Sequence, residues 1–166
     1  MDISRLHIIV VDDLVDAADS TVELLSIWGY DAIACYSGAA GIECTRNRRP
    51  DGVLLDLAMP CMDGFHFAGL FQKLPGCGSV PLVALSGYSS HSYRTRAYAV
   101  GIRHYVLKPA DLTCLKDLLA HEIVATAALL SPCVHNVSGV TVELPSVKRR
   151  ILRGVSPQLC SARITK

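Results

Sequence analysis

Residues that could do chemistry follow short apolar segments at four places in the chain. In order they are Asp12 and Asp13, Asp56, Ser86, and Lys108. Three carboxylates brought together repel one another unless they share a cation, and hard oxygen ligands with open water positions suit Mg²⁺. If the fold gathers these residues, they predict a magnesium site.

A lysine and a serine beside such an ion would suit a phosphoryl group. Lys108 supplies a compact positive charge and Ser86 a hydroxyl donor. Asp56 is the natural nucleophile, because an aspartate can form an acyl phosphate when a metal ion and a lysine neutralise the transferring oxygens. The set therefore predicts a phosphoryl group attached to, or arriving at, a carboxylate.

The apolar segments before these residues are typical of buried parallel strands, and amphipathic segments alternate with them as far as residue 127. The strands are expected at His7–Val11, Asp31–Tyr36, Gly52–Asp56, Leu82–Leu85 and His104–Leu107. Such units favour an α/β fold, a doubly wound, five-stranded parallel sheet with helices on both faces. In that fold the chemical residues meet at the carboxyl ends of the strands.

Five helices are expected between and after the strands. They lie at about 15–28, 37–48, 65–73, the polar segment 89–101, and from 111 onward. Ser37 and Asp111 are predicted to cap two of them. Helical spacing predicts buried faces made by Val15, Ala18, Val22 and Leu25 in the first helix and by Leu112, Leu115, Leu119 and Ile123 in the last.

Charge divides the chain into two parts. The 166 residues are 51% hydrophobic and 19% charged, which provides for a buried core and excludes disorder over the whole length. Residues 1–127 hold ten basic and fourteen acidic side chains, net −4, whereas residues 128–166 hold six and one, net +5. We expect one domain over 4–127 and a basic, partly disordered tail over 128–166. The total of +1 argues against a strongly basic nucleic-acid binder.

The cysteines and apolar runs indicate a cytoplasmic setting. The seven cysteines are odd in number and form no CxxC pair, so neither a disulfide scaffold nor a zinc ribbon is expected. The apolar run near the N-terminus is too short for a signal peptide or anchor, and the run Ile123–Val134 is interrupted by Pro132. No membrane contact is expected.

Four motifs carry a family resemblance: VVDD at 10–13, LLDLAMPCMDG at 54–64, ALSG at 84–87 and YVLKPA at 105–110. Ser86 follows Asp56 by 30 positions and Lys108 follows it by 52. With these spacings, residues 4–127 resemble the receiver domain of two-component response regulators, and single-domain chemotaxis regulators are nearest in size. The resemblance implies the flavodoxin-like (βα)5 fold.

The resemblance also implies roles for the residues of the site. Asp56 would be the phosphoacceptor, Asp13 and Asp56 direct Mg²⁺ ligands, and Asp12 a ligand through water or a positioning acid. The backbone carbonyl of Ala58 would complete the coordination. Two residues after Asp56, where the family often carries a polar side chain that helps govern dephosphorylation, this chain has Ala58, and two residues after Ser86 it has the bulky Tyr88. Neither side chain is an obvious choice for orienting an attacking water, which predicts a long-lived phosphorylated state.

A switch is implied as well. Lys108 would contact a phosphoryl oxygen, and Ser86 would move toward the phosphoryl group while Tyr105 turns inward. This movement would alter the face made by the fourth helix, fifth strand and fifth helix, a switch biased by one covalent charge. The residues expected to contact a partner there are Tyr93, Arg94, Arg96 and Tyr98.

The expected phosphodonor is a sensor histidine kinase or a histidine phosphotransfer protein, and the expected output is contact with a downstream protein. A homodimer through the same face is a further option. The chain is not expected to be an enzyme beyond assisting its own Mg²⁺-dependent phosphotransfer and dephosphorylation.

Other functions stay open on the sequence alone. The basic cluster KRRILR at 148–153 could be a solvated tail, could bind the acidic domain of the same chain, or could contact a partner or nucleic acid. The last option would make the chain a transcriptional regulator, although no recognition helix is evident. An aspartate-nucleophile phosphatase would need a second Asp where Ala58 stands, and a flavodoxin would need a phosphate loop where DDLVD stands.

Overall fold

A computed structural model describes residues 6–130, so the basic cluster at 148–153 lies outside the described residues. Strands and helices alternate along this part of the chain. In order they are β1 (His7–Val11), α1 (Val15–Ile27), β2 (Asp31–Cys35), α2 (Gly38–Asn47), β3 (Gly52–Asp56), α3 (Gly64–Phe71), β4 (Leu82–Ser86), α4 (His91–Ala99), β5 (His104–Leu107) and α5 (Leu112–Leu130).

The five strands form one parallel sheet in the order β2-β1-β3-β4-β5. The chain leaves β1 in one direction to reach β2 and then returns across β1 to β3, so the strand order reverses between β1 and β3. A crevice forms at such a switch point, outside the carboxyl ends of the two strands. The predicted doubly wound sheet is therefore confirmed.

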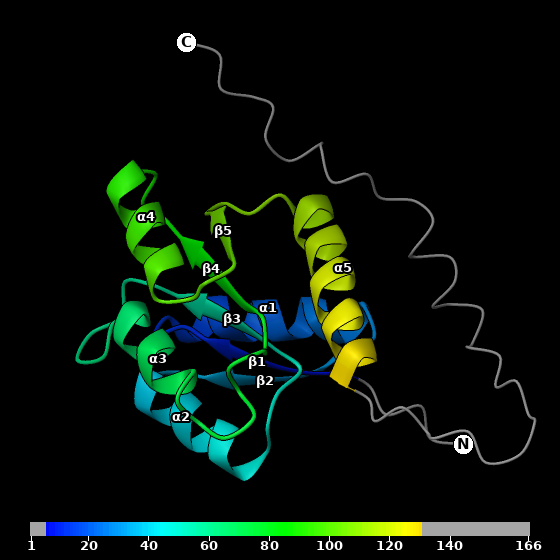
Figure 1. The fold of residues 1–166 in the computed structure, drawn as a ribbon. Coiled ribbons are helices and arrows are strands. Elements are labelled where there is room, and N and C mark those ends of the chain that lie inside the picture. The colour runs from blue at the N-terminus through cyan, green and yellow to red at the C-terminus, as the bar shows by residue number, and fades with distance from the viewer. Residues whose placement is uncertain (1–5, 131–166) are drawn as a thin grey trace, which may run out of the picture. The chain divides into compact units, whose positions relative to one another are not determined.

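Helices cover both faces of the sheet, α1 and α5 on one and α2, α3 and α4 on the other (Figure 1). The burial of β1, β3 and β4 along their whole length is explained by these two layers. Two hydrophobic clusters result. Phe67 and Phe71 of α3 belong to one, and Leu119 and Ile123 of α5 to the other.

Side-chain caps fix the first turns of four helices. Ser37 accepts a hydrogen bond from the Ala40 amide at 3.2 Å, and Asp111 accepts one from the Cys114 amide at 3.0 Å, so both predicted caps are confirmed. Two caps were not predicted: Asp63 caps α3 and Ser90 caps α4.

Two details of the predicted helices are wrong. Val15 and Leu112 were expected in buried faces, but they are 49% and 54% exposed. Each is the first residue of its helix, where few neighbours cover the side chain. The bounds of several elements also shift by one or two residues; β2 ends at Cys35 and leaves Tyr36 exposed. Among the described helices, none combines the length and hydropathy needed to cross a membrane.

Candidate functional site

Asp12 and Asp56 lie at the carboxyl ends of β1 and β3, beside the switch point of the sheet. Both are buried, with exposed fractions of 4% and 7%. The Leu14 amide donates to Asp12 Oδ1 at 3.0 Å, and the Ala58 amide donates to Asp56 Oδ2 at 2.7 Å. Each carboxylate is therefore held by an amide two residues further along its own loop.

Lys108 links these two carboxylates. Its Nζ lies 2.8 Å from Asp12 Oδ2 and 2.8 Å from Asp56 Oδ1, although the three residues are far apart in the sequence. Burial lowers the pKa of Lys108, but hydrogen bonds and charge from both aspartates outweigh it and leave the pKa raised. The ammonium is thus held charged between two buried acids.

The charge of the site is not balanced by Lys108 alone. Asp12 and Asp56 already set two negative charges against one ammonium, and the half-buried Asp13 follows Asp12 directly in the chain. Within the described residues, no three Asp, Glu, His or Cys side chains gather closely enough to hold a metal ion by themselves. The oxygen-only donors and excess negative charge nevertheless fit a hard divalent cation that keeps several waters.

Ser86 and Tyr105 both meet the backbone of Tyr88. Ser86 ends β4, is 1% exposed, and its Oγ accepts a hydrogen bond from the Tyr88 amide at 3.1 Å. Tyr105 in β5 is half-buried, and its hydroxyl donates to the Tyr88 carbonyl at 2.7 Å. Sequence reasoning did not predict this role for Tyr88, because hydrogen bonds made by backbone atoms do not depend on the residue type.

Close packing fixes the loop that follows Asp56. An added Cβ at Gly64 would stand 2.5 Å from the Asp56 carbonyl oxygen and 2.8 Å from Leu57 Cα, both backbone atoms. The Gly64 amide also donates to the Leu57 carbonyl at 3.1 Å. The start of α3 is thereby held against the end of β3. Ala58, whose carbonyl was predicted to bind metal, lies exposed in this loop.

The four residues predicted to contact a partner have different surroundings. Tyr98 is 56% exposed, and Tyr93 is half-buried against Phe65 and Tyr88. The Arg94 guanidinium lies 5.6 Å from the centre of the Tyr105 ring. These residues therefore do not form a single, freely exposed patch.

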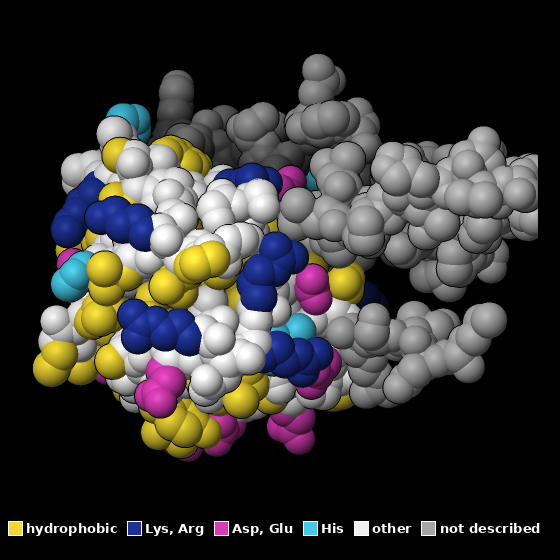
Figure 2. Space-filling view, turned by 60° about the horizontal axis from the view of Figure 1, so that its bottom comes forward, with side chains coloured by type: hydrophobic (Ala, Val, Ile, Leu, Met, Phe, Trp, Pro, Cys, Tyr) yellow, Lys and Arg dark blue, Asp and Glu magenta, His cyan; other side chains and the backbone are white. Residues whose placement is uncertain are grey.

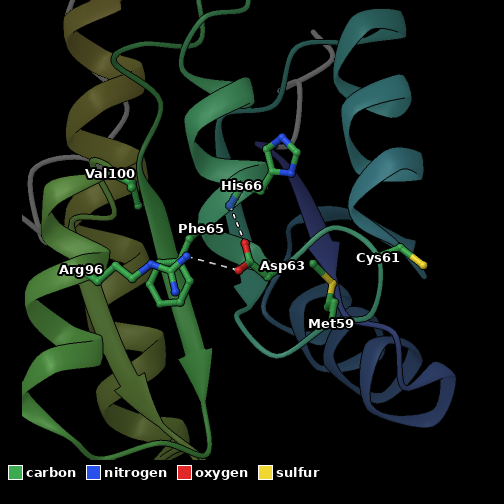
Figure 3. A pocket seen from close by; sticks show the side chains of 7 residues that line it. All are labelled: Met59, Cys61, Asp63, Phe65, His66, Arg96 and Val100. Atoms are coloured by element: carbon green, nitrogen blue, oxygen red, sulfur yellow. Dashed lines mark hydrogen bonds and ion pairs between the residues drawn. The ribbon is translucent and has the colours of Figure 1, made fainter.

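Arg96, the fourth of these residues, turns toward α3. Its guanidinium lies 4.0 Å above the Phe65 ring, and Nη2 is 3.4 Å from Asp63 Oδ2 (Figure 3). Met59, Cys61 and Val100 join them around an open hollow of about 410 Å³ between the loop after Asp56 and α4. Arg96 thus connects α4 with the residues just beyond the acidic site.

Basic side chains do not form a continuous patch on the face shown in Figure 2. Lys and Arg side chains there lie in separate groups, divided by polar and hydrophobic ones, with acidic side chains beside several of them. Binding to a nucleic-acid backbone depends on many basic side chains that act together. This face therefore lacks the electrostatic pattern of a nucleic-acid interface.

The parallel sheet thus brings two buried acids and a lysine together at its switch point, and comparison with known proteins identifies the class of domain. Residues 8–120 match the family model of the response regulator receiver domain. The chain therefore belongs to the response regulator receiver family. Residues 8–120 are thus a response regulator receiver domain, the domain class of two-component systems.

Sequence relatives include the transcriptional regulatory protein PrrA of Mycobacterium tuberculosis, 27% identical over 148 residues. That match covers 87% of this chain and 62% of PrrA, so the chain spans about three fifths of this relative. ZraR of Salmonella typhimurium, also named a transcriptional regulatory protein, is 30% identical over 122 residues, which cover 74% of this chain and 27% of ZraR.

Solved structures share the fold. Chemotaxis protein CheY4 of Vibrio cholerae superposes with a TM-score of 0.68 at 22% identity, over 71% of this chain and 98% of CheY4. The N-terminal domain of a response regulator receiver protein from Methanoculleus marisnigri is 30% identical with a TM-score of 0.58, over 70% of this chain and 94% of that domain. The predicted flavodoxin-like receiver fold is confirmed.

Proposed function

We propose that Asp56 accepts a phosphoryl group from a phosphohistidine of a sensor histidine kinase or a histidine phosphotransfer protein. The observation that carries this proposal is the position of Lys108, whose Nζ contacts both Asp12 and Asp56 at 2.8 Å. An ammonium group in this position stabilises the negative charge of the carboxylate. It can also stabilise the negative charge of a phosphoryl oxygen as the phosphoryl group arrives. Receiver-family membership supports the choice of donor.

In the transfer step, a carboxylate oxygen of Asp56 attacks phosphorus. The phosphorus–oxygen bond forms as the phosphorus–nitrogen bond of the donor breaks, and the electron pair returns to the imidazole nitrogen. Lys108 holds the phosphoryl oxygens, and the Ala58 amide, 2.7 Å from Asp56 Oδ2, keeps the carboxylate oriented. Ser86 then supplies a hydroxyl to the new phosphoryl group from the end of β4.

We propose Mg²⁺ as the cofactor. Asp13 and Asp56 would hold it directly, Asp12 through water or by positioning, and Ala58 through its carbonyl. The excess negative charge of the site and its oxygen-only donors support this assignment. A bound magnesium ion supplies positive charge for the phosphoryl oxygens.

The output that we propose is contact with a downstream protein through α4, β5 and α5, with a second copy of the chain as an alternative partner on that face. The chain turns over no separate substrate and acts only on its own phosphoryl group. We place the reaction in the cytoplasm, and the free thiols of Cys35, Cys44, Cys61 and Cys77 support a reducing setting.

Phosphorylation with and without metal tests this proposal. The full chain is incubated with acetyl phosphate and Mg²⁺, or with excess chelator, and the phosphorylated fraction is measured over time. We expect phosphorylation only with Mg²⁺, and weaker Mg²⁺ binding by Asp13→Asn in calorimetry. Equal phosphorylation with chelator would contradict the metal assignment.

Transcriptional regulation is the second candidate, favoured by the names of the relatives PrrA and ZraR. The basic tail beyond residue 127 would then contact DNA. DNA binding by the full chain and by residues 1–127 can be compared across salt concentrations. Tight, sequence-specific binding that requires the tail would favour this function.

A further inference from the structure

Tyr88 is placed where the two switch residues meet. Its amide donates to Ser86 Oγ at 3.1 Å, and its carbonyl accepts from the Tyr105 hydroxyl at 2.7 Å. One peptide segment therefore holds the end of β4 and the side chain from β5. Any shift of the Tyr88 backbone would move the partners of Ser86 and Tyr105 together.

The Tyr88 ring fixes that backbone to α4. It stacks on Tyr93 with ring centroids 4.7 Å apart and planes inclined by 14°. An offset stack of this kind contributes beyond the apolar area that it buries. Tyr88 is 49% exposed, so its ring adds little to the hydrophobic core. Burial therefore does not explain why the ring lies against Tyr93.

The row of rings continues to the loop after the acidic site. Tyr93 packs on Phe65, with centroids 5.7 Å apart, and Arg96 covers Phe65 at 4.0 Å while it pairs with Asp63 (Figure 3). Because Phe65 follows Gly64, which packs on the Asp56 carbonyl, the row spans both loops of the site. Helix α4 is thus attached to the loop of Ser86 and to the loop of Asp56.

We infer that Tyr88 is a positioning residue that couples the phosphoryl site to α4 through its ring stack on Tyr93. This inference rests on the proposed function, and it adds a residue whose side chain touches neither carboxylate nor phosphoryl group. The ring keeps the Tyr88 amide and carbonyl in place, so Ser86 and Tyr105 are oriented for phosphorylation. Movement of Ser86 on phosphorylation is passed to α4 by the same stack.

The test compares four variants of the full chain with wild type: Tyr88→Ala, Tyr88→Phe, Tyr93→Ala and Thr95→Ala. Phosphorylation of Asp56 by acetyl phosphate with Mg²⁺ is followed by intact mass. We expect Tyr88→Ala and Tyr93→Ala to react more slowly by about 2- to 10-fold, the factor that loss of one aromatic pair corresponds to. Tyr88→Phe keeps the ring and should react at the wild-type rate, as should Thr95→Ala at an exposed position of α4.

Two further measurements separate coupling from mere stability. The double variant Tyr88→Ala/Tyr93→Ala should be no slower than either single variant, because both remove the same stack. Hydrogen exchange of α4 should change on phosphorylation in wild type and Tyr88→Phe but much less in Tyr88→Ala, with thermal unfolding showing that each variant is folded.

A wild-type chain that reacts and a folded Tyr88→Ala that reacts equally fast, with the same exchange in α4, would overturn the inference alone. Additive slowing by Tyr88→Ala and Tyr93→Ala would also overturn it. A wild-type chain that gains no phosphoryl group would overturn the proposed function together with this inference.

Discussion

Lys108 lies between two buried carboxylates, Asp12 and Asp56. Its removal should lower both the rate of phosphorylation and the stability of the fold. We expect Lys108→Met to slow phosphorylation by about 100-fold or more, the range for loss of one group that stabilises transition-state charge. Its free energy of unfolding should also fall at neutral pH, because Asp12 and Asp56 then repel each other. The rate is measured by intact mass. Lys73→Met, at an exposed lysine, is the control, and equal rates in the two variants would refute this role.

Ala58 has no side-chain polar group that could orient a water toward the phosphoryl group that we propose on Asp56. It is exposed and lies two residues after Asp56. We expect Ala58→Asn to shorten the lifetime of the phosphorylated state by about 10-fold. This factor is smaller than the roughly 100-fold or more that a positioned acid or base contributes, because an amide orients the water without taking its proton. Loss of the phosphorylated mass over time measures it. A wild-type half-life of seconds at room temperature would disagree with the long lifetime expected from Ala58 and Tyr88.

Asp31 offers a pH test at the opposite end of the sheet. A hydrogen bond from Arg48 lowers the pKa of Asp31. A lowered pKa stabilises the folded state fully above the unfolded value of about 3.9, and this contribution is lost as the pH falls through the folded value. Because both side chains are largely exposed, Asp31→Asn should cost at most about 1 kcal/mol at pH 7.

Urea unfolding of wild type and Asp31→Asn at about pH 7 and about pH 3 measures this contribution. The difference between the two proteins should narrow at the lower pH. A difference that stays constant would show that the pair with Arg48 is not its source.

At the scale of single residues, sequence reasoning found what depends on residue type. Asp12, Asp56 and Lys108 come together because the ends of parallel strands share one edge. The contacts of Tyr88 and the turn of Arg96 toward Phe65 could not be found this way. They depend on backbone atoms and side-chain rotamers that only the packed structure fixes.

Among the elements, the loop between β3 and α3 is the part whose shape most directly serves the site. Gly64→Ala would press a Cβ against the Asp56 carbonyl, so we expect a loss of about 1–3 kcal/mol in stability and slower phosphorylation. Gly69→Ala is the matched control in the same helix, because its Cβ would meet nothing within 4 Å. It should gain up to about 1 kcal/mol. Urea unfolding checks both values, and equal effects would refute the close-approach argument.

Element positions were largely predictable, because β-branched runs, caps and glycines mark where strands and helices begin and end. Helix periodicity, however, does not show whether the first turn of a helix is covered by neighbouring elements. For this reason Val15 and Leu112 fit an apolar face in the sequence and still lie exposed in the structure. Asp63 and Ser90 were missed as caps, because they stand in loops whose path the sequence does not show.

For the whole molecule, the alternation of strands and helices predicts a doubly wound parallel sheet, and the structure adds the strand order β2-β1-β3-β4-β5. The near-zero net charge conceals an acidic domain of −4, part of which is concentrated at Asp12, Asp13 and Asp56. That concentration explains why one lysine and, as proposed, a divalent ion meet at the switch point. The concentration of acidic residues and the reversal of strand order thus both point to the carboxyl ends of β1 and β3 as the functional site.

The central claim is that Asp56 alone receives the phosphoryl group. The full chain, its Asp56→Asn variant and an Asp117→Asn control on the exposed side of α5 are incubated with acetyl phosphate and Mg²⁺, and their intact masses are measured. A mass gain of one phosphoryl group in wild type and Asp117→Asn, and none in Asp56→Asn, is predicted. No gain in wild type, or an undiminished gain in Asp56→Asn, would contradict the account.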